Sequence, residues 1–194
     1  ISAVSEIVLQ TKTEKALGGV RLEMEGGKDP VVTAAGCSVG TKIEISNLFF
    51  NTPARKKYLK SEQTEYRHIL ETVQDAALSH PEIGFKFVSN GRTIFDLLGN
   101  DKLQARIGGL FGKSVSGEMV EVFYGGSDIQ FSGFIGKPQT ARATRKYQYF
   151  IVNGRPVQDH RLAYAVKDGF SNLIPGTQHP VFVVLITIDP RQVD

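Results

Sequence analysis

The chain has 194 residues, 41% of them hydrophobic, which is enough to bury the core of one large domain or two small ones. Its formal net charge of +3 does not by itself indicate a class of partner. No apolar run approaches the roughly eighteen residues of a membrane span, and the first residues lack the basic start of a secretory signal. The single cysteine, Cys37, excludes an internal disulfide framework and is typical of a reducing, cytoplasmic setting.

Short strands joined by glycine-containing turns dominate the first part of the chain. Alternation of polar and apolar residues predicts strands over residues 4–12, 20–24, 31–33 and 42–46. Strands this short and this closely spaced are typical of a mostly antiparallel sheet.

Two helices are predicted next. Pro53 fits the first turn of a short basic helix that ends near Leu59, because the first turn does not need the N–H that proline lacks. Ser61 then suits the N-cap of a longer helix, which Pro81 ends. The residues spaced to form its apolar face are Tyr66, Ile69, Leu70, Val73 and Ala77.

A hairpin separates the two halves of the chain. Asn90-Gly91 lies between strand-like runs over 84–89 and 92–98, and this dipeptide predicts a two-residue hairpin turn. The following Gly99-Asn100 is the expected domain boundary.

The second half is predicted to mix helices and strands. Asp101 is expected to cap a short helix that carries Leu103, Ile107 and Leu110 and ends at Gly112. Further along, the pattern predicts strands over 119–124, 128–135, 147–152 and 181–188, a mobile basic loop over 136–146 and a helix over 161–170. The last strand is continuously apolar, as in a strand buried on both faces, and the strand–helix–strand order predicts parallel neighbours.

Two basic clusters stand out, and no catalytic constellation does. The clusters either bind phosphates or are solvated faces, and both interpretations stay open; they comprise Arg55, Lys56, Lys57 and Lys60, and Lys137, Arg142, Arg145 and Lys146. The histidines and Cys37 show no metal-ligand spacing, and phosphate-loop and nucleophile-elbow motifs are absent. The Thr41 hydroxyl beside Gly40 suits either a contact to a nucleobase or a bound water, or a plain turn into a strand. Asn153-Gly154-Arg155 is either an ordinary turn or a polar anchor that reaches a neighbouring domain.

Four segments resemble one known family. Residues 40–59, GTKIEISNLFFNTPARKKYL, resemble the signature of the MutL family of DNA mismatch-repair proteins. The match continues in order through YFIVNGR at 149–155 and IDPRQVD at 188–194. The start, ISAVSEIVLQTKT, resembles the segment that follows the family's glycine-rich ATP lid, so the resemblance covers the whole chain.

The resemblance implies a fold of class α+β/α/β with two subdomains. Residues 1–99 would be the later part of an ATPase sandwich of the gyrase, heat-shock chaperone and histidine-kinase type. Residues 101–194 would be most of a transducer that resembles domain 2 of ribosomal protein S5.

The resemblance also implies a cofactor, partners and a location. The intact parent would use ATP and Mg²⁺, form an ATP-dependent homodimer and bind DNA without sequence preference. It would signal from MutS to a downstream nicking or excision enzyme. A bacterial, cytoplasmic and nucleoid-associated location follows, with no membrane.

The family's functional positions carry over to few residues here. Gly40 and Thr41 match positions of the nucleotide pocket, and Lys60, with its neighbour Lys57, matches the basic helix end that lines the DNA passage. Arg161 lies near another DNA-contacting position, although the local spacing differs. The adjacent Asn51-Thr52 and Arg55 are expected to shape the fold beside the nucleotide pocket.

The family's catalytic glutamate, its metal-binding asparagine and its γ-phosphate lysine have no counterpart in this sequence. The chain starts at Ile1 without a methionine and stops at Asp194, so we expect a fragment of a longer protein. Hydrolysis needs a base, a positioned water and stabilisation of phosphate charge. We therefore expect the fragment to have no catalytic residues or metal ligands, to bind no cofactor and to hydrolyse no ATP.

Two other interpretations belong to different functional classes. One is a dimerisation or partner-docking module without direct DNA contact. The other is an S5-like RNA-binding protein unrelated to repair, against which the Asn51-Thr52-Pro53-Ala54-Arg55 segment argues, because an S5-like module alone would not supply it.

Overall fold

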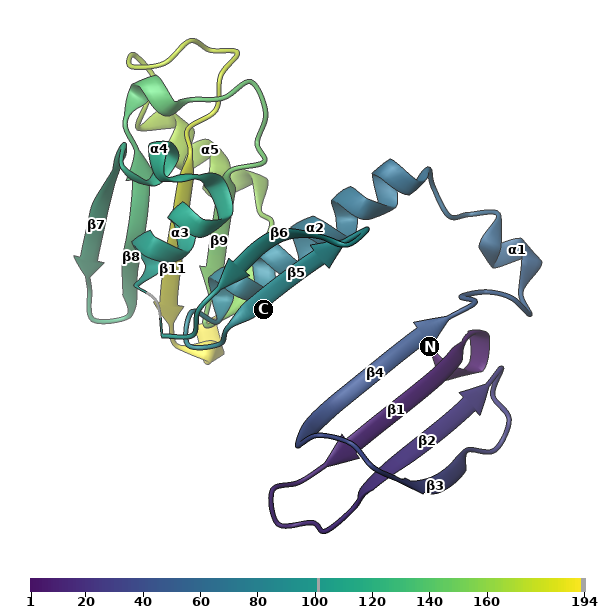
Figure 1. Cartoon of the computed structure of the whole chain (residues 1–194). Coiled ribbons are helices and arrows are strands. Elements are labelled where there is room, and N and C mark those ends of the chain that lie inside the picture. Colours follow the sequence, from purple (N-terminus) through teal and green to yellow (C-terminus); the bar gives the residue numbers. More distant parts are fainter. Residues whose placement is uncertain (101, 193–194) are drawn as a thin grey trace. The chain divides into compact units, whose positions relative to one another are not determined.

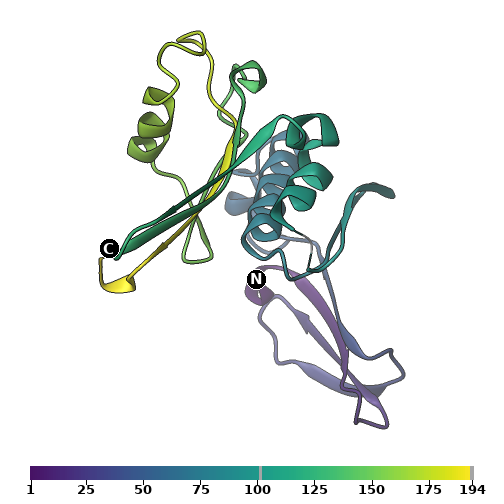
Figure 2. The ribbon, with the colours of Figure 1, turned by 90° about the vertical axis from the view of Figure 1, so that its left-hand side faces the viewer.

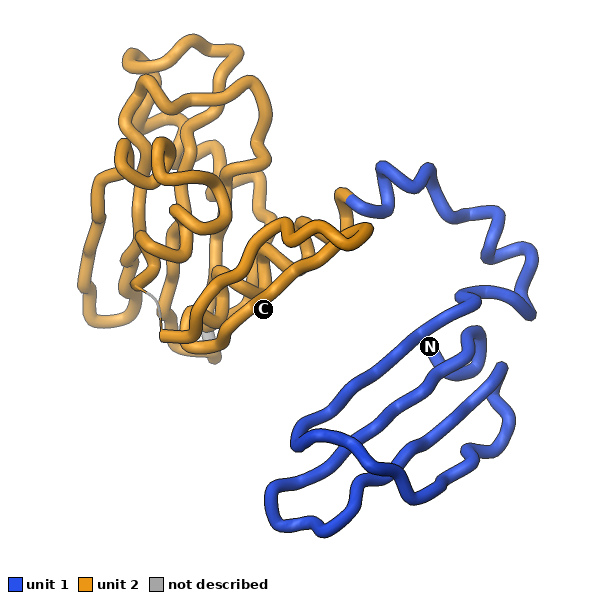
Figure 3. Tube along the Cα trace, in the orientation of Figure 1, with its two compact units in different colours: residues 1–66 blue, residues 67–194 orange. Residues whose placement is uncertain are grey.

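The computed structural model describes residues 1–100 and 102–192, so Asp101, predicted as a helix cap, and the last two residues of the IDPRQVD segment lie outside the described residues. The chain forms two compact units, residues 1–66 and 67–194 (Figure 3). The boundary between these units lies earlier than Gly99-Asn100, because most of the long helix over 62–79 and the hairpin pack with the later residues. The subdomain bounds 1–99 and 101–194 stay a prediction about the intact protein.

The first unit is an antiparallel sheet in the order β3-β2-β1-β4 (Figure 1). A short 3-10 turn, η1, precedes it, and its elements are η1 Ser2–Val4, β1 Glu6–Lys12, β2 Gly19–Glu25, β3 Val31–Ala35 and β4 Gly40–Ser46. All four predicted strands are confirmed. Strand β4 is an edge strand that pairs with β1 alone, and each of its residues is exposed.

The segment after β4 is tied to the start of the chain. Asn47 and Phe49 adopt positive φ angles of 52° and 63°, which turn the backbone sharply. The Phe49 N–H donates to the Val4 carbonyl at 2.6 Å, and Asn51 Nδ2 donates to the Ala3 carbonyl at 2.9 Å. Helix α1, Pro53–Lys56, follows and is shorter than predicted.

The second unit is built on a five-stranded mixed sheet in the order β10-β9-β11-β8-β7. Its strands are β7 Met119–Gly125, β8 Ile129–Gly136, β9 Gln148–Val152, β10 Arg155–Val157 and β11 Phe182–Ile188. Strand β11 pairs parallel with β9 and antiparallel with β8, which confirms the predicted parallel neighbours. The three-residue edge strand β10 was not predicted.

Helices cover both faces of this sheet. Figure 2 shows α5, His160–Asp168, on one side, with α3, Leu103–Phe111, on the other. The side chains of β11 divide between the two sides. Val183 packs with Leu78 and Ile107, as does Val181 just before the strand. Phe182, Val184 and Ile186 pack on the other side, with Phe150, Leu162 and Val166. The prediction of a strand buried on both faces is therefore confirmed.

The long helix α2, Glu62–Ser79, begins as predicted, because the Ser61 hydroxyl accepts from the Thr64 N–H at 3.3 Å. Leu70, Val73 and Ala77 pack against the hairpin. Ile69 is 53% exposed, so its placement on the buried face is wrong. Adjacent helical residues lie roughly 100° apart around the axis, which carries Ile69 out of the contact that Leu70 makes.

The hairpin joins β5, Phe85–Ser89, to β6, Arg92–Leu97. Asn90 and Gly91 both have positive φ angles, 49° and 73°, as the predicted two-residue turn requires. Gly112, with φ 94°, ends α3, and the short α4, Lys113–Ser116, follows. Among the described residues, none of the helices is both long and apolar enough to cross a bilayer.

The basic loop predicted as mobile is anchored in its first half. Thr140 and Ala141 are buried, and Pro138–Thr140 forms a 3-10 turn, η2. Arg142 and His179 exchange backbone hydrogen bonds of 2.9 and 2.7 Å. The prediction of a mobile loop is wrong there, because backbone hydrogen bonds, rather than an apolar face, attach the loop to the rest of the unit.

Arg106 is fully buried at the junction between α3 and the hairpin. Its Nη2 donates to the carbonyls of Pro81 at 2.6 Å and of Ile83 and Leu98, both at 2.8 Å. Pro81 and Ile83 come before β5 of the hairpin, and Leu98 follows β6. The guanidinium carbon Cζ also lies 5.9 Å from the centroid of the Phe85 ring, in a cation–π contact. One guanidinium thus connects α3 to both ends of the hairpin.

We expect Arg106→Met to lower the free energy of unfolding of the intact protein by about 2 kcal/mol, because the carbonyls of Pro81, Ile83 and Leu98 lose the donor that the buried guanidinium provides. Urea unfolding measures the change. The exposed Arg92→Met, at the hairpin itself, is the matched control. Equal stability of the two variants would contradict the role of Arg106.

Candidate nucleotide and DNA contacts

Gly40 and Thr41 open strand β4 and face the end of β1. In the β1–β4 register, Thr41 lies opposite Thr11 and Gly40 opposite Lys12. The φ angle of Gly40 is 117°, a conformation that favours glycine, and nothing lies within 4 Å of the place where a Cβ would be. The backbone, rather than a steric conflict, explains the glycine at this position.

The Thr41 hydroxyl is paired with the Thr11 hydroxyl at 2.9 Å in an exposed position. Each hydroxyl has one proton and two lone pairs, so the pair keeps the capacity for a further hydrogen bond. This fits one polar contact to a nucleobase or a bound water. Gly40 and Thr41 do not together form a phosphate cradle, so the rest of a nucleotide pocket would need other residues.

Lys57 and Lys60 lie at the other end of the same segment. Lys57 caps the C-terminus of α1, where positive charge is favoured by the helix dipole. The Lys60 N–H donates to Glu65 Oε1 at 2.7 Å, which fixes its backbone beside the start of α2. Both side chains are exposed, and neither is in an ion pair within the described part of the chain. They remain available to phosphate groups.

Arg161, in the second unit, is arranged differently. Asp159 is the N-cap of α5, and its Oδ1 accepts from the N–H groups of Arg161 and Leu162 at 2.7 and 3.1 Å. Its Oδ2 also holds the Arg161 guanidinium at 3.0 Å. The Arg161 side chain is 93% exposed. Asp159 therefore partly neutralises the charge of Arg161, the predicted DNA contact. The family resemblance did not indicate this ion pair.

These contacts also shift two pKa values. The hydrogen bond from the Arg161 guanidinium and the two backbone N–H groups lower the pKa of Asp159 to about 2. The same carboxylate raises the pKa of Arg161.

Asn153 lies in a turn, the first of its two open interpretations, and its side chain bonds within its own unit rather than to a neighbouring domain. Its Nδ2 donates to the Ile188 carbonyl at 2.9 Å, and its Oδ1 accepts from the Ile188 N–H at 3.1 Å. With φ 49°, it also opens the turn between β9 and β10. The Asn153 side chain thus joins the YFIVNGR segment to the beginning of IDPRQVD.

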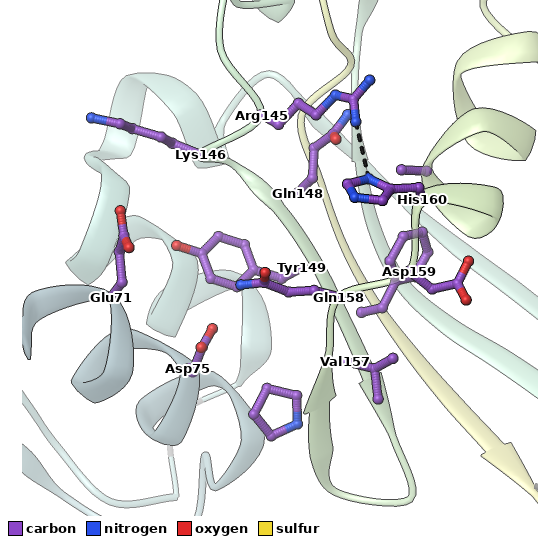
Figure 4. Close-up of a pocket in the computed structure, with 13 residues that line it drawn as sticks. Glu71, Asp75, Arg145, Lys146, Gln148, Tyr149, Val157, Gln158, Asp159 and His160 are labelled. Carbon is purple, nitrogen blue, oxygen red and sulfur yellow. Dashed lines mark hydrogen bonds between the residues drawn. The ribbon is translucent and has the colours of Figure 1, made fainter. Parts of the chain in front are cut away.

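A pocket of about 570 Å³, which sequence reasoning missed, opens between α2 and α5. Figure 4 shows Tyr149 between Glu71 and Asp75 from α2 and His160 from α5, with Arg145 and Lys146 above. The sequence indicated the basic cluster that includes Arg145 and Lys146, but not that two carboxylates lie opposite it. Within the described residues, no group of three or more His, Cys, Asp or Glu side chains is placed to hold a metal ion.

Comparison with known proteins identifies the family. A family model described as "DNA mismatch repair protein, C-terminal domain" matches residues 107–194. MutL of Thermoanaerobacter sp. (strain X514) is 39% identical over all 194 residues, which are 32% of that protein. MutL of Streptococcus mutans is 36% identical, also over the whole chain and over 30% of its own length. The chain belongs to the MutL family of DNA mismatch-repair proteins. It spans about a third of the length of these curated relatives.

Solved structures confirm the predicted fold class. The Aquifex aeolicus MutL ATPase domain complexed with ADP has a TM-score of 0.80 and 28% identity, covering 98% of this chain and 70% of that one. The B-subunit of DNA gyrase from Myxococcus xanthus has a TM-score of 0.52 at 11% identity, covering 99% of this chain and 59% of that one, and shares the fold alone. This MutL chain therefore has the mixed α/β fold of the gyrase-type ATPases.

The lowered pKa of the Asp159 cap predicts that the stability of the protein depends on pH in the acid range. The folded pKa of about 2 lies below the ordinary 3.8, so the stabilisation is present above about pH 4 and is lost as the pH falls through 2. Asp159→Asn keeps a cap acceptor and removes the charge. We expect the gap between the melting temperatures of wild type and variant to be constant from about pH 7 to 5 and to close toward pH 2.

Thermal unfolding in a series of buffers measures this gap. Asp168→Asn, at the opposite end of α5, is the control for loss of one negative charge. A gap for Asp159→Asn that stays unchanged at the lowest pH would contradict the contribution of the cap.

Proposed function

We propose that this chain is the part of a DNA mismatch-repair ATPase in which nucleotide and DNA contacts lie on one continuous segment. In the intact protein, ATP-driven dimerisation would be coupled to DNA binding and to signalling from MutS to a downstream nicking or excision enzyme. Similarity to MutL proteins over all 194 residues is the observation that carries this proposal. A cytoplasmic, nucleoid-associated location belongs to the same proposal, because the substrate would be chromosomal DNA.

The nucleotide part is supported by the structural relative that is complexed with ADP. In this chain, Gly40 and Thr41 would provide one edge of such a site through the free hydrogen-bonding capacity of the hydroxyl pair. Mg²⁺ and ATP phosphates would be held by residues of the intact protein beyond these two. ATP would supply the phosphoanhydride whose binding and cleavage drive the cycle.

The DNA part is supported by exposed cations that have no carboxylate partner among the residues that the structure describes. Lys57 and Lys60 can each neutralise a phosphate, whereas Arg161 would first have to leave Asp159 or share its guanidinium. Phosphate contacts of this kind position a protein on DNA without reading its sequence. Lys57 and Lys60 are therefore the stronger candidates.

A second candidate function is a dimerisation or docking module without direct DNA contact. The Asp159–Arg161 pair favours it to a degree, because that pair reduces the positive charge available on α5. The two functions differ in one observable, the dependence of DNA binding on Lys60 and on salt.

We expect Lys60→Glu in the intact protein to weaken binding of duplex DNA several-fold at about 0.1 M salt and to reduce the slope of log affinity against log salt by about one. Fluorescence anisotropy across a salt series measures both. Lys15→Glu, the same charge reversal at an exposed lysine in the β1–β2 connection, is the matched control. Wild-type affinity in Lys60→Glu, or binding that ignores salt, would support the docking module instead.

Nucleotide binding is tested with a non-hydrolysable ATP analogue. We expect the intact protein to dimerise with the analogue, as measured by sedimentation velocity. Thr41→Val should raise the concentration of analogue needed by about three- to tenfold, because one hydrogen bond is lost. Thr33→Val, the same substitution on β3, should leave it unchanged. If the intact protein neither binds the analogue nor dimerises, the ATPase proposal fails.

A further inference from the structure

The pocket between α2 and α5 has two walls of opposite charge that are not neutralised within the described residues. Neither the nucleotide contact at Thr41 nor the DNA contacts at Lys57 and Lys60 use it. Its lining comes from α2, from residues 145–150 and from residues 156–163, all within the second unit (Figure 4). Among the lining residues, Asp159 alone bears on the proposed function, through its ion pair with Arg161.

The acidic wall is formed by Glu71 and Asp75, one helical turn apart on α2. Like charges at this spacing destabilise a helix. Asp75 is half-buried, and its burial and then the charge of Glu71 raise its pKa. Neither carboxylate is in an ion pair with any residue that the structure describes. A cation placed between them would relieve this repulsion.

The basic wall is formed by Arg145 and Lys146, which precede β9. Arg145 Nη1 lies 3.2 Å from His160 Nδ1, and its guanidinium lies 5.6 Å from the Tyr164 ring centroid. These contacts hold the guanidinium in place without neutralising it. Like Lys146, Arg145 has no carboxylate partner in the described ranges. A held cation of this kind is suited to bind a carboxylate in a defined geometry.

Tyr149 forms the floor between the walls. Its ring stacks on Phe111 with the ring centroids 5.4 Å apart. Within the described part of the chain, its hydroxyl makes one long hydrogen bond, of 3.5 Å, to Gln74 Oε1. Burial, then the charges of Asp75 and Glu71, raise its pKa, so the hydroxyl keeps its proton and can donate. Phe150, Pro156 and Val157 add apolar surface. The floor thus suits the backbone and the carbon chains of a peptide.

The two walls select among possible occupants. A DNA strand would bring phosphates against Arg145 and also against Glu71 and Asp75, which repel them. A small inorganic ion would satisfy one wall only. A volume of about 570 Å³ is within the range of pockets that take ligands or short peptide segments.

We propose that this pocket binds a segment of a partner protein that carries one basic and one acidic side chain. The lysine or arginine of the partner lies between Glu71 and Asp75, and its aspartate or glutamate contacts Arg145 and Lys146. The Tyr149 hydroxyl donates to a backbone carbonyl of the segment. The charge pattern of the pocket thereby defines a partner with closely spaced charges of both signs.

The test uses the intact protein and blocked peptides. The probe is acetyl-Arg-Gly-Glu-amide, and the controls replace either charged residue by glutamine. Isothermal titration should show the doubly charged peptide binding about tenfold more tightly than either control. Asp75→Asn and Arg145→Gln should each remove about that factor, whereas Glu121→Gln and Arg92→Gln, exposed sites outside the pocket, should not.

Other outcomes overturn the proposal. Equal affinity for all three peptides, or affinity unchanged in both pocket variants, shows that the walls do not select the ligand. Displacement of the peptide by short duplex DNA, with tighter DNA binding by Asp75→Asn, assigns the pocket to DNA instead. Glu71→Gln is the second acidic-wall variant, and circular dichroism of each variant separates loss of binding from loss of fold.

Discussion

The burial of β11 on both faces is the constraint on which the second unit depends. Val183 and Phe182 point to opposite sides of the sheet, and each is almost completely buried. An apolar strand of this kind is stable only if helices cover both faces, and α3 and α5 do so. Burying one such side chain contributes on the order of 2 kcal/mol, so the two faces together outweigh any single surface contact in the unit.

The pocket and the Arg106 junction both follow from this arrangement. Helix α2 contributes Leu78 to the core on one face of the sheet, and α5 covers the other face. The pocket lies between these two helices, beside the edge strand β10, which is only three residues long. Tyr149 on β9 contributes to the core through Phe111 and to the pocket through its hydroxyl. Arg106 attaches the hairpin, so the elements beside the pocket are fixed at the same time.

Local patterns predicted most of the elements. Asn90-Gly91 specified its turn through backbone conformation, and the apolar run of β11 specified a central strand, since both signals are complete within a few residues. The exposure of Ile69, the burial of Arg106 and the carboxylates opposite Arg145 depend on which distant segments pack together. No local pattern contains that information. The family resemblance indicated Arg161 as a DNA contact, but only the structure shows that Arg161 forms an ion pair with Asp159.

The segment from Gly40 to Lys60 connects the two proposed contacts of the first unit. Strand β4 leads from Thr41 to the turn at Asn47, and α1 leads on to Lys57 and Lys60 (Figure 1). Hydrogen–deuterium exchange of the intact protein, with a non-hydrolysable ATP analogue and then with duplex DNA, tests this account most directly. The account predicts slower exchange at the start of β4 with the analogue and around Lys57–Lys60 with DNA. Unchanged exchange over the whole segment with both ligands would contradict it.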